Sequence, residues 1–283
     1  MKVRVITAVA ALCVLAVVLC LFDTPVVNLA VAFLAAVAAH ESSRTVGCLK
    51  YKWLTFVGVA FAALVPLTIT WLGSGVVYAL ALVYVVLAFG VIVSKYPDIQ
   101  VPSVGLLVMM TVGVTLSFNC LVLIRDAAPH KAVGIYYVAI IMASAWMCDT
   151  GAYFVGCKFG KRRLAPVVSP KKSVEGLYGG LVTAVVGNVL LSVLFVQLQH
   201  RGMIGGSLSI LWNINYFYVA LATPVLSLLG VLGDLSASVV KRHYGIKDFG
   251  TLFPGHGGVL DRFDSLLFIA PLVYLMMRYL PLL

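Results

Sequence analysis

Long apolar runs separated by short polar connections make up most of this chain. Each run is close to the roughly 20 residues needed to cross the hydrocarbon core of a bilayer. The runs lie at residues 5–22, 25–41, 53–72, 75–94, 102–124, 134–156, 176–198, 209–233 or a little beyond, and 264–282. This pattern predicts an all-α, polytopic membrane protein with about nine transmembrane helices.

The composition supports the same fold class. Of the 283 residues, 62% are hydrophobic and 11% are charged, whereas soluble domains carry about 25% charged residues. No internal repeat or long polar linker is visible, so we expect a single integral membrane domain over residues 1–283. The six cysteines show no CxxC pairing, which indicates neither a disulfide framework nor a zinc site.

The distribution of lysine and arginine predicts the topology. If the N-terminus is cytoplasmic, 16 of the 20 basic residues fall on the inner side, as the positive-inside rule requires. The net charge of +10 is then explained by cytoplasmic loops, and no nucleic-acid partner is expected. The connections at 157–175 and 241–263 would both face the cytoplasm. His40 and Glu41, which close the second run, are expected to be interfacial polar residues.

Charged residues gather in one short stretch, residues 234–264. An ionised Asp deep in a bilayer costs about 2.5–3.5 kcal/mol. Carboxylates next to apolar spans therefore indicate a functional role. Asp261 and Asp264 would share one helix face, with Cβ atoms about 5–6 Å apart, and Asp234 would complete a metal site with them. The alternative is that Asp261 caps the helix and Asp264 forms an ion pair. The stretch contains Asp234, Lys241, Arg242, Lys247, Asp248, Asp261, Arg262 and Asp264.

The glycine-rich turn at 254–258 precedes this pair of acids. Its backbone amides would turn toward one point and form a nest for phosphate; an ordinary interfacial turn is the alternative. His256 would either donate a hydrogen bond to phosphate or serve as a turn residue.

A second polar block covers residues 149–176. Asp149 lies within an apolar run, where the alternatives are a ligand role or a structural hydrogen bond. Ser169 and Pro170 form a typical helix start, with Ser169 as N-cap and Pro170 in the first turn. The free amides of that turn, beside Lys171 and Lys172, would bind an anion; a capped helix with ordinary cytoplasmic lysines is the alternative. Mixed-sign clusters like these two blocks suit sites for Mg²⁺ and phosphate together.

Both blocks together resemble the phosphatidate cytidylyltransferase family, also called CDP-diacylglycerol synthases. Over residues 238–264, Ser-x-Val-Lys-Arg is followed at fixed spacing by Lys-Asp, Phe-Pro-x-His-Gly-Gly and Asp-Arg-Phe-Asp. Residues 149–176 are similar to a second region of the family, and residues 2–8 are similar to its start. Ala237, Phe249 and Val174 depart from the residues common at these positions.

The resemblance implies a reaction in phospholipid synthesis: transfer of the cytidylyl group of CTP to phosphatidate, giving CDP-diacylglycerol and pyrophosphate. It implies a Mg²⁺ cofactor, with a second cation left open. The implied catalytic residues are Asp149, Asp234, Lys241, Arg242, Asp261 and Asp264, of which Asp234, Asp261 and Asp264 would bind the metal. The implied substrate-binding residues are Ser169, Lys171, Lys172, Glu175, Lys247, Asp248, His256, Gly257, Gly258 and Arg262.

The resemblance also implies partners and location. CTP and phosphatidate would be the substrates, membrane lipid would surround the protein, and a homodimer is one open assembly. The enzyme would be a multi-pass protein of the inner, cytoplasmic membrane, with an active-site cavity open to the cytoplasm and to the inner leaflet. Residues 1–132 would form five variable spans, and residues 133–283 the catalytic spans six to nine.

Two other functions use similar residues. A CTP-dependent lipid kinase, such as one acting on a polyprenol, also needs metal, triphosphate contacts and membrane spans. A cation transporter also keeps acidic residues within the membrane, although here the charges gather at one face. A CDP-alcohol phosphotransferase is disfavoured, because the run Asp-x2-Asp-Gly-x2-Ala-Arg is missing from the sequence.

Overall fold

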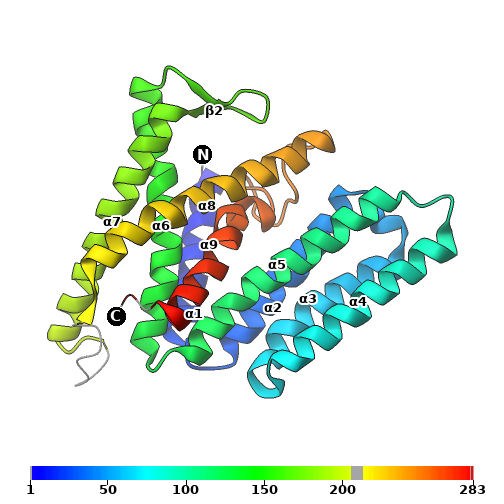
Figure 1. The fold of residues 1–283 in the computed structure, drawn as a ribbon, viewed down its shortest axis with the longest axis horizontal. Coiled ribbons are helices and arrows are strands. Elements are labelled where there is room, and N and C mark those ends of the chain that lie inside the picture. The colour runs from blue at the N-terminus through cyan, green and yellow to red at the C-terminus, as the bar shows by residue number, and fades with distance from the viewer. Residues whose placement is uncertain (1, 205–212, 281, 283) are drawn as a thin grey trace. The chain divides into compact units, whose positions relative to one another are not determined.

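The computed structural model describes residues 2–204, 213–280 and 282. Within these residues the chain forms nine α-helices, one short 3₁₀ helix (η1) and one β-hairpin (Figure 1). The elements are α1 (Lys2–Cys20), α2 (Val26–Thr45), η1 (Cys48–Lys50), α3 (Lys52–Leu72), α4 (Ser74–Lys95), α5 (Val101–Ala127), α6 (Lys131–Phe159), β1 (Arg163–Ala165), β2 (Ser169–Ser173), α7 (Val174–His200), α8 (Tyr216–His243) and α9 (Leu260–Tyr279).

The helices confirm the predicted all-α, polytopic membrane class. Among the described residues, seven helices, α2 to α8, are long and apolar enough to cross a membrane by length and composition. Helix α1 has a shorter apolar part, Ile6–Cys20. The exact number of spans and the cytoplasmic side of the N-terminus stay predictions.

Helix α8 differs from the apolar run that predicted it. The run was predicted at 209–233 or a little beyond; residues 209–212 lie outside the described part, and the helix begins at Tyr216. It continues to His243, and its last turn is polar. Three basic residues, Lys241, Arg242 and His243, occupy the last turn, where cations interact favourably with the helix dipole.

The predicted helix start at Ser169 and Pro170 is wrong. Both residues belong to β2, which pairs antiparallel with β1; Arg163 lies opposite Ser173, and Ala165 lies opposite Ser169. A proline is tolerated here because each strand of a two-stranded hairpin is an edge strand. The cap of α7 is Ser173, whose Oγ accepts a hydrogen bond from the amide of Gly176 at 3.1 Å. The anion site expected at a Ser169 cap is therefore not formed.

The chain divides into two compact units. Unit 1 comprises residues 1–123 and 241–263, and unit 2 comprises residues 124–240 and 264–283. Helices α5, α8 and α9 contribute residues to both units. The single integral membrane domain, with its variable and catalytic parts, stays a prediction.

In unit 1, α3 packs between α2 and α4. The buried Asn28 of α2 donates hydrogen bonds to the carbonyl of Pro66 at 2.6 Å and to the Thr70 hydroxyl at 2.9 Å, both in α3. Phe61 of α3 stacks on Tyr84 of α4 with ring centroids 5.3 Å apart. A polar contact and an aromatic contact therefore fix the three helices relative to one another.

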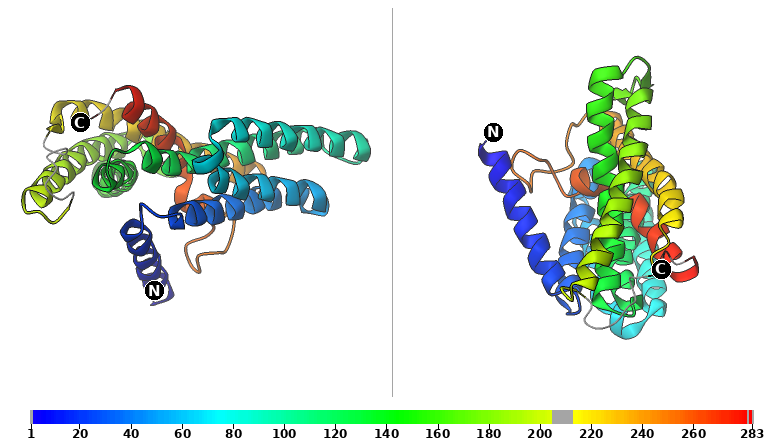
Figure 2. Two further views of the ribbon diagram at one scale, coloured as in Figure 1. Left: turned by 90° about the horizontal axis from the view of Figure 1, so that it is seen from below. Right: turned by 90° about the vertical axis from the view of Figure 1, so that its left-hand side faces the viewer.

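In unit 2, α6 and α7 lie side by side along their lengths (Figure 1; Figure 2, right). A Cβ atom at Gly180 would lie 2.5 Å from the carbonyl oxygen of Cys148, and one at Gly176 would lie 2.8 Å from that of Ala152. Small residues four apart let membrane helices approach to backbone contact. This packing positions β1 and β2, which connect the two helices.

A buried polar cluster joins α6, α7 and α8. Asn188 of α7 donates to the hydroxyls of Ser144 at 2.8 Å and Thr223 at 3.0 Å, and Ser227 of α8 donates to the carbonyl of Ser144 at 3.0 Å. Hydrogen bonds between membrane helices are worth roughly 0.6–2 kcal/mol each. They fix how far α8 is shifted along α6 and α7.

Gly180→Ala tests the close packing of α6 and α7. The added methyl would overlap the carbonyl of Cys148, and overpacking of this kind costs about 1–3 kcal/mol, so we expect a lower midpoint of thermal unfolding in detergent. The matched control is Gly113→Ala in α5, where nothing lies within 4 Å of the Cβ position. Its midpoint should stay the same or rise, since Ala is a better helix former than Gly. Equal midpoints for the two variants would contradict the packing.

Candidate active site

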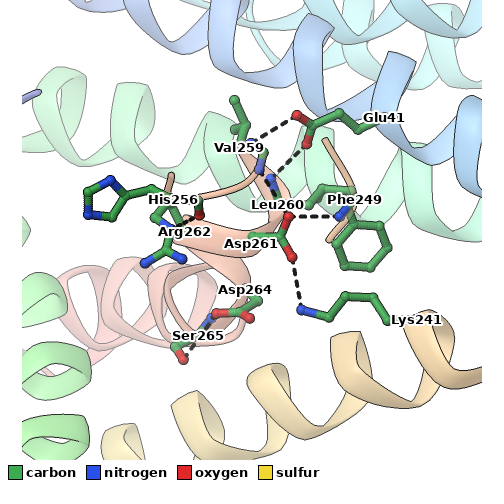
Figure 3. Close-up of polar contacts among 11 residues, drawn as sticks. Glu41, Lys241, Phe249, His256, Val259, Leu260, Asp261, Arg262, Asp264 and Ser265 are labelled. Atoms are coloured by element: carbon green, nitrogen blue, oxygen red, sulfur yellow. Dashed lines mark hydrogen bonds and ion pairs between the residues drawn. The ribbon is translucent and has the colours of Figure 1, made fainter. Parts of the chain in front are cut away.

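The carboxylate of Asp261, near the start of α9, organises the loop over residues 249–258 in unit 1. Its Oδ1 accepts from the Lys241 ammonium at 2.9 Å, and its Oδ2 accepts from the amides of Phe249 at 2.7 Å and Gly258 at 3.0 Å (Figure 3). The Asp261 side chain is 3% exposed and that of Lys241 is 12% exposed. This one buried carboxylate therefore holds the two ends of the loop together.

A second carboxylate reaches the same region from α2. Glu41 Oε1 accepts from the amide of Val259 and its Oε2 from that of Leu260, both at 3.0 Å (Figure 3). These two amides open α9 and have no acceptor within the helix itself. Glu41 is 4% exposed, so it is a buried acceptor of hydrogen bonds; the interfacial position of His40 and Glu41 stays a prediction. Because 218 residues separate Glu41 from Val259, no local pattern signals this contact.

The glycine-rich turn does not form the predicted phosphate nest. The amides of His256 and Gly257 both donate to the carbonyl of Phe253, at 2.8 and 3.1 Å, and the amide of Gly258 donates to Asp261. Gly257 has φ +90°, a conformation that favours glycine. All three amides thus donate hydrogen bonds within the turn and to Asp261, and none is directed at a ligand.

Side chains of the turn region remain as groups that would contact a ligand. His256 Nδ1 is buried and has no hydrogen-bond partner among the described residues. The guanidinium of Arg262 donates through Nε to the carbonyl of His256 at 2.7 Å, and its side chain is otherwise exposed. Either group suits an anionic ligand.

The end of α8 and the connection after it carry further predicted site residues of unit 1. Arg242, Lys247 and Asp248 are exposed. Asp248 lines a pocket of about 270 Å³ together with Arg44 and Thr45 at the end of α2 and with Ile246, Phe249, Gly250 and Thr251.

Unit 2 brings together three of the predicted site residues. Lys172 of β2 forms an ion pair with Asp234 of α8; their side chains are 28% and 25% exposed. Asp149 of α6 lies within electrostatic range of both. Three elements therefore place one ammonium group beside two carboxylates, a grouping that the sequence analysis did not predict.

Helices α8 and α9 touch through their backbones beside Asp234. Gly233 packs against the carbonyl of Asp264 so closely that a Cβ atom at Gly233 would overlap it. Asp264 accepts a hydrogen bond from the amide of Ser265 at 2.7 Å through Oδ1. The backbones of Asp234 and Asp264 consequently lie close to each other within unit 2.

The β-hairpin is held by Glu175 in the first turn of α7. Its Oε2 accepts from the amides of Lys161 at 2.9 Å and Arg162 at 3.1 Å. The predicted substrate contact of Glu175 would therefore compete with these backbone bonds. Lys171 is exposed on β2, and Ser169 lies in the strand beside it.

The carboxylates of the site differ in how well they fit Mg²⁺. In the described part of the chain, no group of three or more His, Cys, Asp or Glu side chains is placed to hold a metal ion. Magnesium, however, is commonly held by one or two carboxylates together with substrate phosphates, and Asp149 with Asp234 fits that donor set. Both oxygens of Asp261 accept hydrogen bonds, so a metal at Oδ1 would compete with Lys241. The metal and its predicted ligands, Asp234, Asp261 and Asp264, stay predictions.

Comparison with known proteins identifies the family. The cytidylyltransferase family profile matches residues 2–280. The chain belongs to the cytidylyltransferase family. This membership confirms the resemblance seen in the two polar blocks, and it extends over the helices before them.

Relatives of this chain carry the name phosphatidate cytidylyltransferase. One from Bacillus subtilis (strain 168) is 38% identical over 199 residues, which cover 70% of this chain and 66% of the relative. One from Staphylococcus haemolyticus is 39% identical and one from Staphylococcus aureus (strain COL) is 40% identical, each over 147 residues, or 52% of this chain and 51% of the relative. The chain thus matches between half and two thirds of the length of these relatives.

A double-mutant cycle tests the buried pair of Lys241 and Asp261. Lys241→Met or Asp261→Asn alone leaves one buried charge without its partner, which costs about 3–5 kcal/mol. The double variant removes both charges, so its loss of unfolding free energy should fall short of the sum of the single losses by about 1–3 kcal/mol. Denaturant unfolding in detergent measures all three. Additive losses would contradict the pair.

Proposed function

We propose that this chain transfers the cytidylyl group of CTP to phosphatidate, releasing pyrophosphate and forming CDP-diacylglycerol for phospholipid synthesis. The observation that carries the proposal is the family match over residues 2–280, joined by relatives named for this activity at 38–40% identity. The ammonium group of Lys172 between two carboxylates supports it, because a triphosphate needs positive charge where a divalent cation also binds.

The proposed reaction is a displacement at phosphorus. An oxygen of the phosphatidate phosphate attacks the α-phosphorus of CTP, the bond from that phosphorus to the bridging oxygen breaks, and pyrophosphate leaves with the electron pair. The attacking phosphate monoester is already anionic near neutral pH, so no strong general base is required. Catalysis then depends on positioning and on neutralising negative charge.

Residues of the chain would both position the substrates and neutralise their negative charge. Lys172 and Lys241 are each held by a carboxylate, and their ammonium groups would contact phosphate oxygens. His256 and Arg262 would bind phosphate at the loop of unit 1. Asp149 and Asp234 would hold Mg²⁺, which when bound neutralises charge on the phosphates.

The exposed residues would meet the substrates at the membrane surface. Lys171, Arg242, Lys247 and Asp248 would contact the lipid headgroup or the nucleotide. The uneven distribution of basic residues supports a cytoplasmic active site in the inner membrane, where CTP is available and phosphatidate enters from the bilayer. A homodimer stays a prediction.

Incubation of the purified protein with cytidine-labelled CTP and phosphatidate tests the reaction. We expect label in a lipid product on thin-layer chromatography and release of pyrophosphate that depends on phosphatidate. EDTA should stop both, and added Mg²⁺ should restore them. Free labelled CDP without labelled lipid would indicate a kinase instead, and turnover that persists in EDTA would contradict the metal.

Asp234→Asn tests the cluster of Asp149, Lys172 and Asp234. Loss of one charge that neutralises or positions the phosphates should lower kcat/KM for CTP about 100-fold or more. The control is Asp126→Asn in the last turn of α5, which removes an acid that pairs with the neighbouring Arg125 at 2.6 Å. It should leave kcat/KM unchanged. Equal activity of the two variants would exclude Asp234 from the reaction.

A further inference from the structure

The Glu41 carboxylate occupies a place where an acid is costly. It is almost fully buried, and the Asp261 carboxylate lies within electrostatic range. A buried carboxylate is tolerated when hydrogen bonds replace its water shell. Here the amides of Val259 and Leu260 provide one bond to each oxygen, and the positive end of the α9 dipole favours the negative charge.

Two glycines of the loop close in on the same carboxylate. A Cβ atom at Gly250, near the start of the loop, or at Gly258, at its end, would overlap Glu41 Oε1. The backbone at both ends therefore fits around this one group. Asp261 also contacts both ends of the loop, because it accepts hydrogen bonds from the amides of Phe249 and Gly258. Glu41 reaches the loop from α2, whereas Asp261 follows the loop in sequence.

We infer that Glu41 is a positioning residue for the reaction. By anchoring the first amides of α9 and both ends of the 249–258 loop, it sets where His256, Asp261 and Arg262 are presented to substrate. It touches no substrate itself and acts through the loop. The kinetic part of this inference rests on the proposed function; the structural part stands without it.

Glu41→Gln is the informative change because it preserves size. The glutamine carbonyl accepts from one amide, but its NH₂ group is a donor and faces the other amide. One of Val259 and Leu260 then loses its acceptor. The fold of α2 should persist, while the start of α9 and the loop lose their fixed position.

Hydrogen–deuterium exchange tests the anchor directly. In Glu41→Gln, exchange at whichever of Val259 and Leu260 loses its acceptor should speed up about 10- to 100-fold, the effect of losing a hydrogen bond to a charged group. Amides in the middle of α9 should exchange as in the wild type. The matched control, Asp23→Asn, removes an exposed acid between α1 and α2 and should change neither region.

Kinetics distinguish positioning from mere stability. In assays well below the unfolding midpoint, Glu41→Gln should lower kcat/KM for CTP at least about 10-fold, with Asp23→Asn at the wild-type value. Gly258→Ala should lower kcat/KM to a similar extent, because the added methyl group would displace the Glu41 carboxylate from its position. In a Glu41→Ala background, adding Gly258→Ala should lower kcat/KM little further, since the overlapping group is gone.

The outcomes separate the two claims. Faster exchange together with lower kcat/KM supports the inference. Wild-type exchange in Glu41→Gln, or faster exchange with wild-type kcat/KM, overturns it. If the wild-type protein itself does not convert CTP, the proposed function fails, and the exchange measurement alone decides whether Glu41 anchors the loop.

Discussion

Four backbone amides, in the 249–258 loop and at the start of α9, donate to two buried carboxylates, and the positions of His256 and Arg262 in unit 1 depend on that arrangement. Glu41 accepts from Val259 and Leu260, and Asp261 accepts from Phe249 and Gly258. These amides lie outside regular hydrogen-bonded structure, where a buried N–H without an acceptor is costly. Each carboxylate in turn needs donors, because burial removes its water. Loop and carboxylates therefore stabilise each other.

In each unit, a lysine is paired with a carboxylate. Lys241 contacts Asp261 in unit 1, and Lys172 contacts Asp234 in unit 2. A buried or half-buried ammonium group held by a carboxylate is positioned before substrate arrives, so little rearrangement is needed when phosphate binds. In a chain that is 62% hydrophobic, such paired charges are concentrated in the two segments that also carry the family's resemblance. In the proposed function, fold stability and anion binding would therefore use the same side chains.

Patterns within single segments predicted the fold class. Features that depend on contacts between distant segments could not be predicted from the sequence. Apolar length predicted the helices, and Asp261 near a helix start was readable because the signal is local. Ser169 and Pro170 gave an equally local helix signal, yet pairing with β1 overrode it. Glu41 offered no signal, since its partners lie 218 and 219 residues away. The glycine turn was recognised from the sequence, but its amides donate to the carbonyl of Phe253 and to Asp261. Which acceptors these amides use depends on the tertiary structure.

Amide exchange in the wild-type protein in detergent tests the central claim most directly. If two carboxylates hold the loop, the amides of Phe249, Gly258, Val259 and Leu260 should exchange as slowly as those of the first full turns of α9. The exposed neighbours Thr251 and Leu252 should exchange far faster. Uniformly fast exchange from residue 249 to residue 260 would contradict the account, because the loop would then have no fixed acceptors.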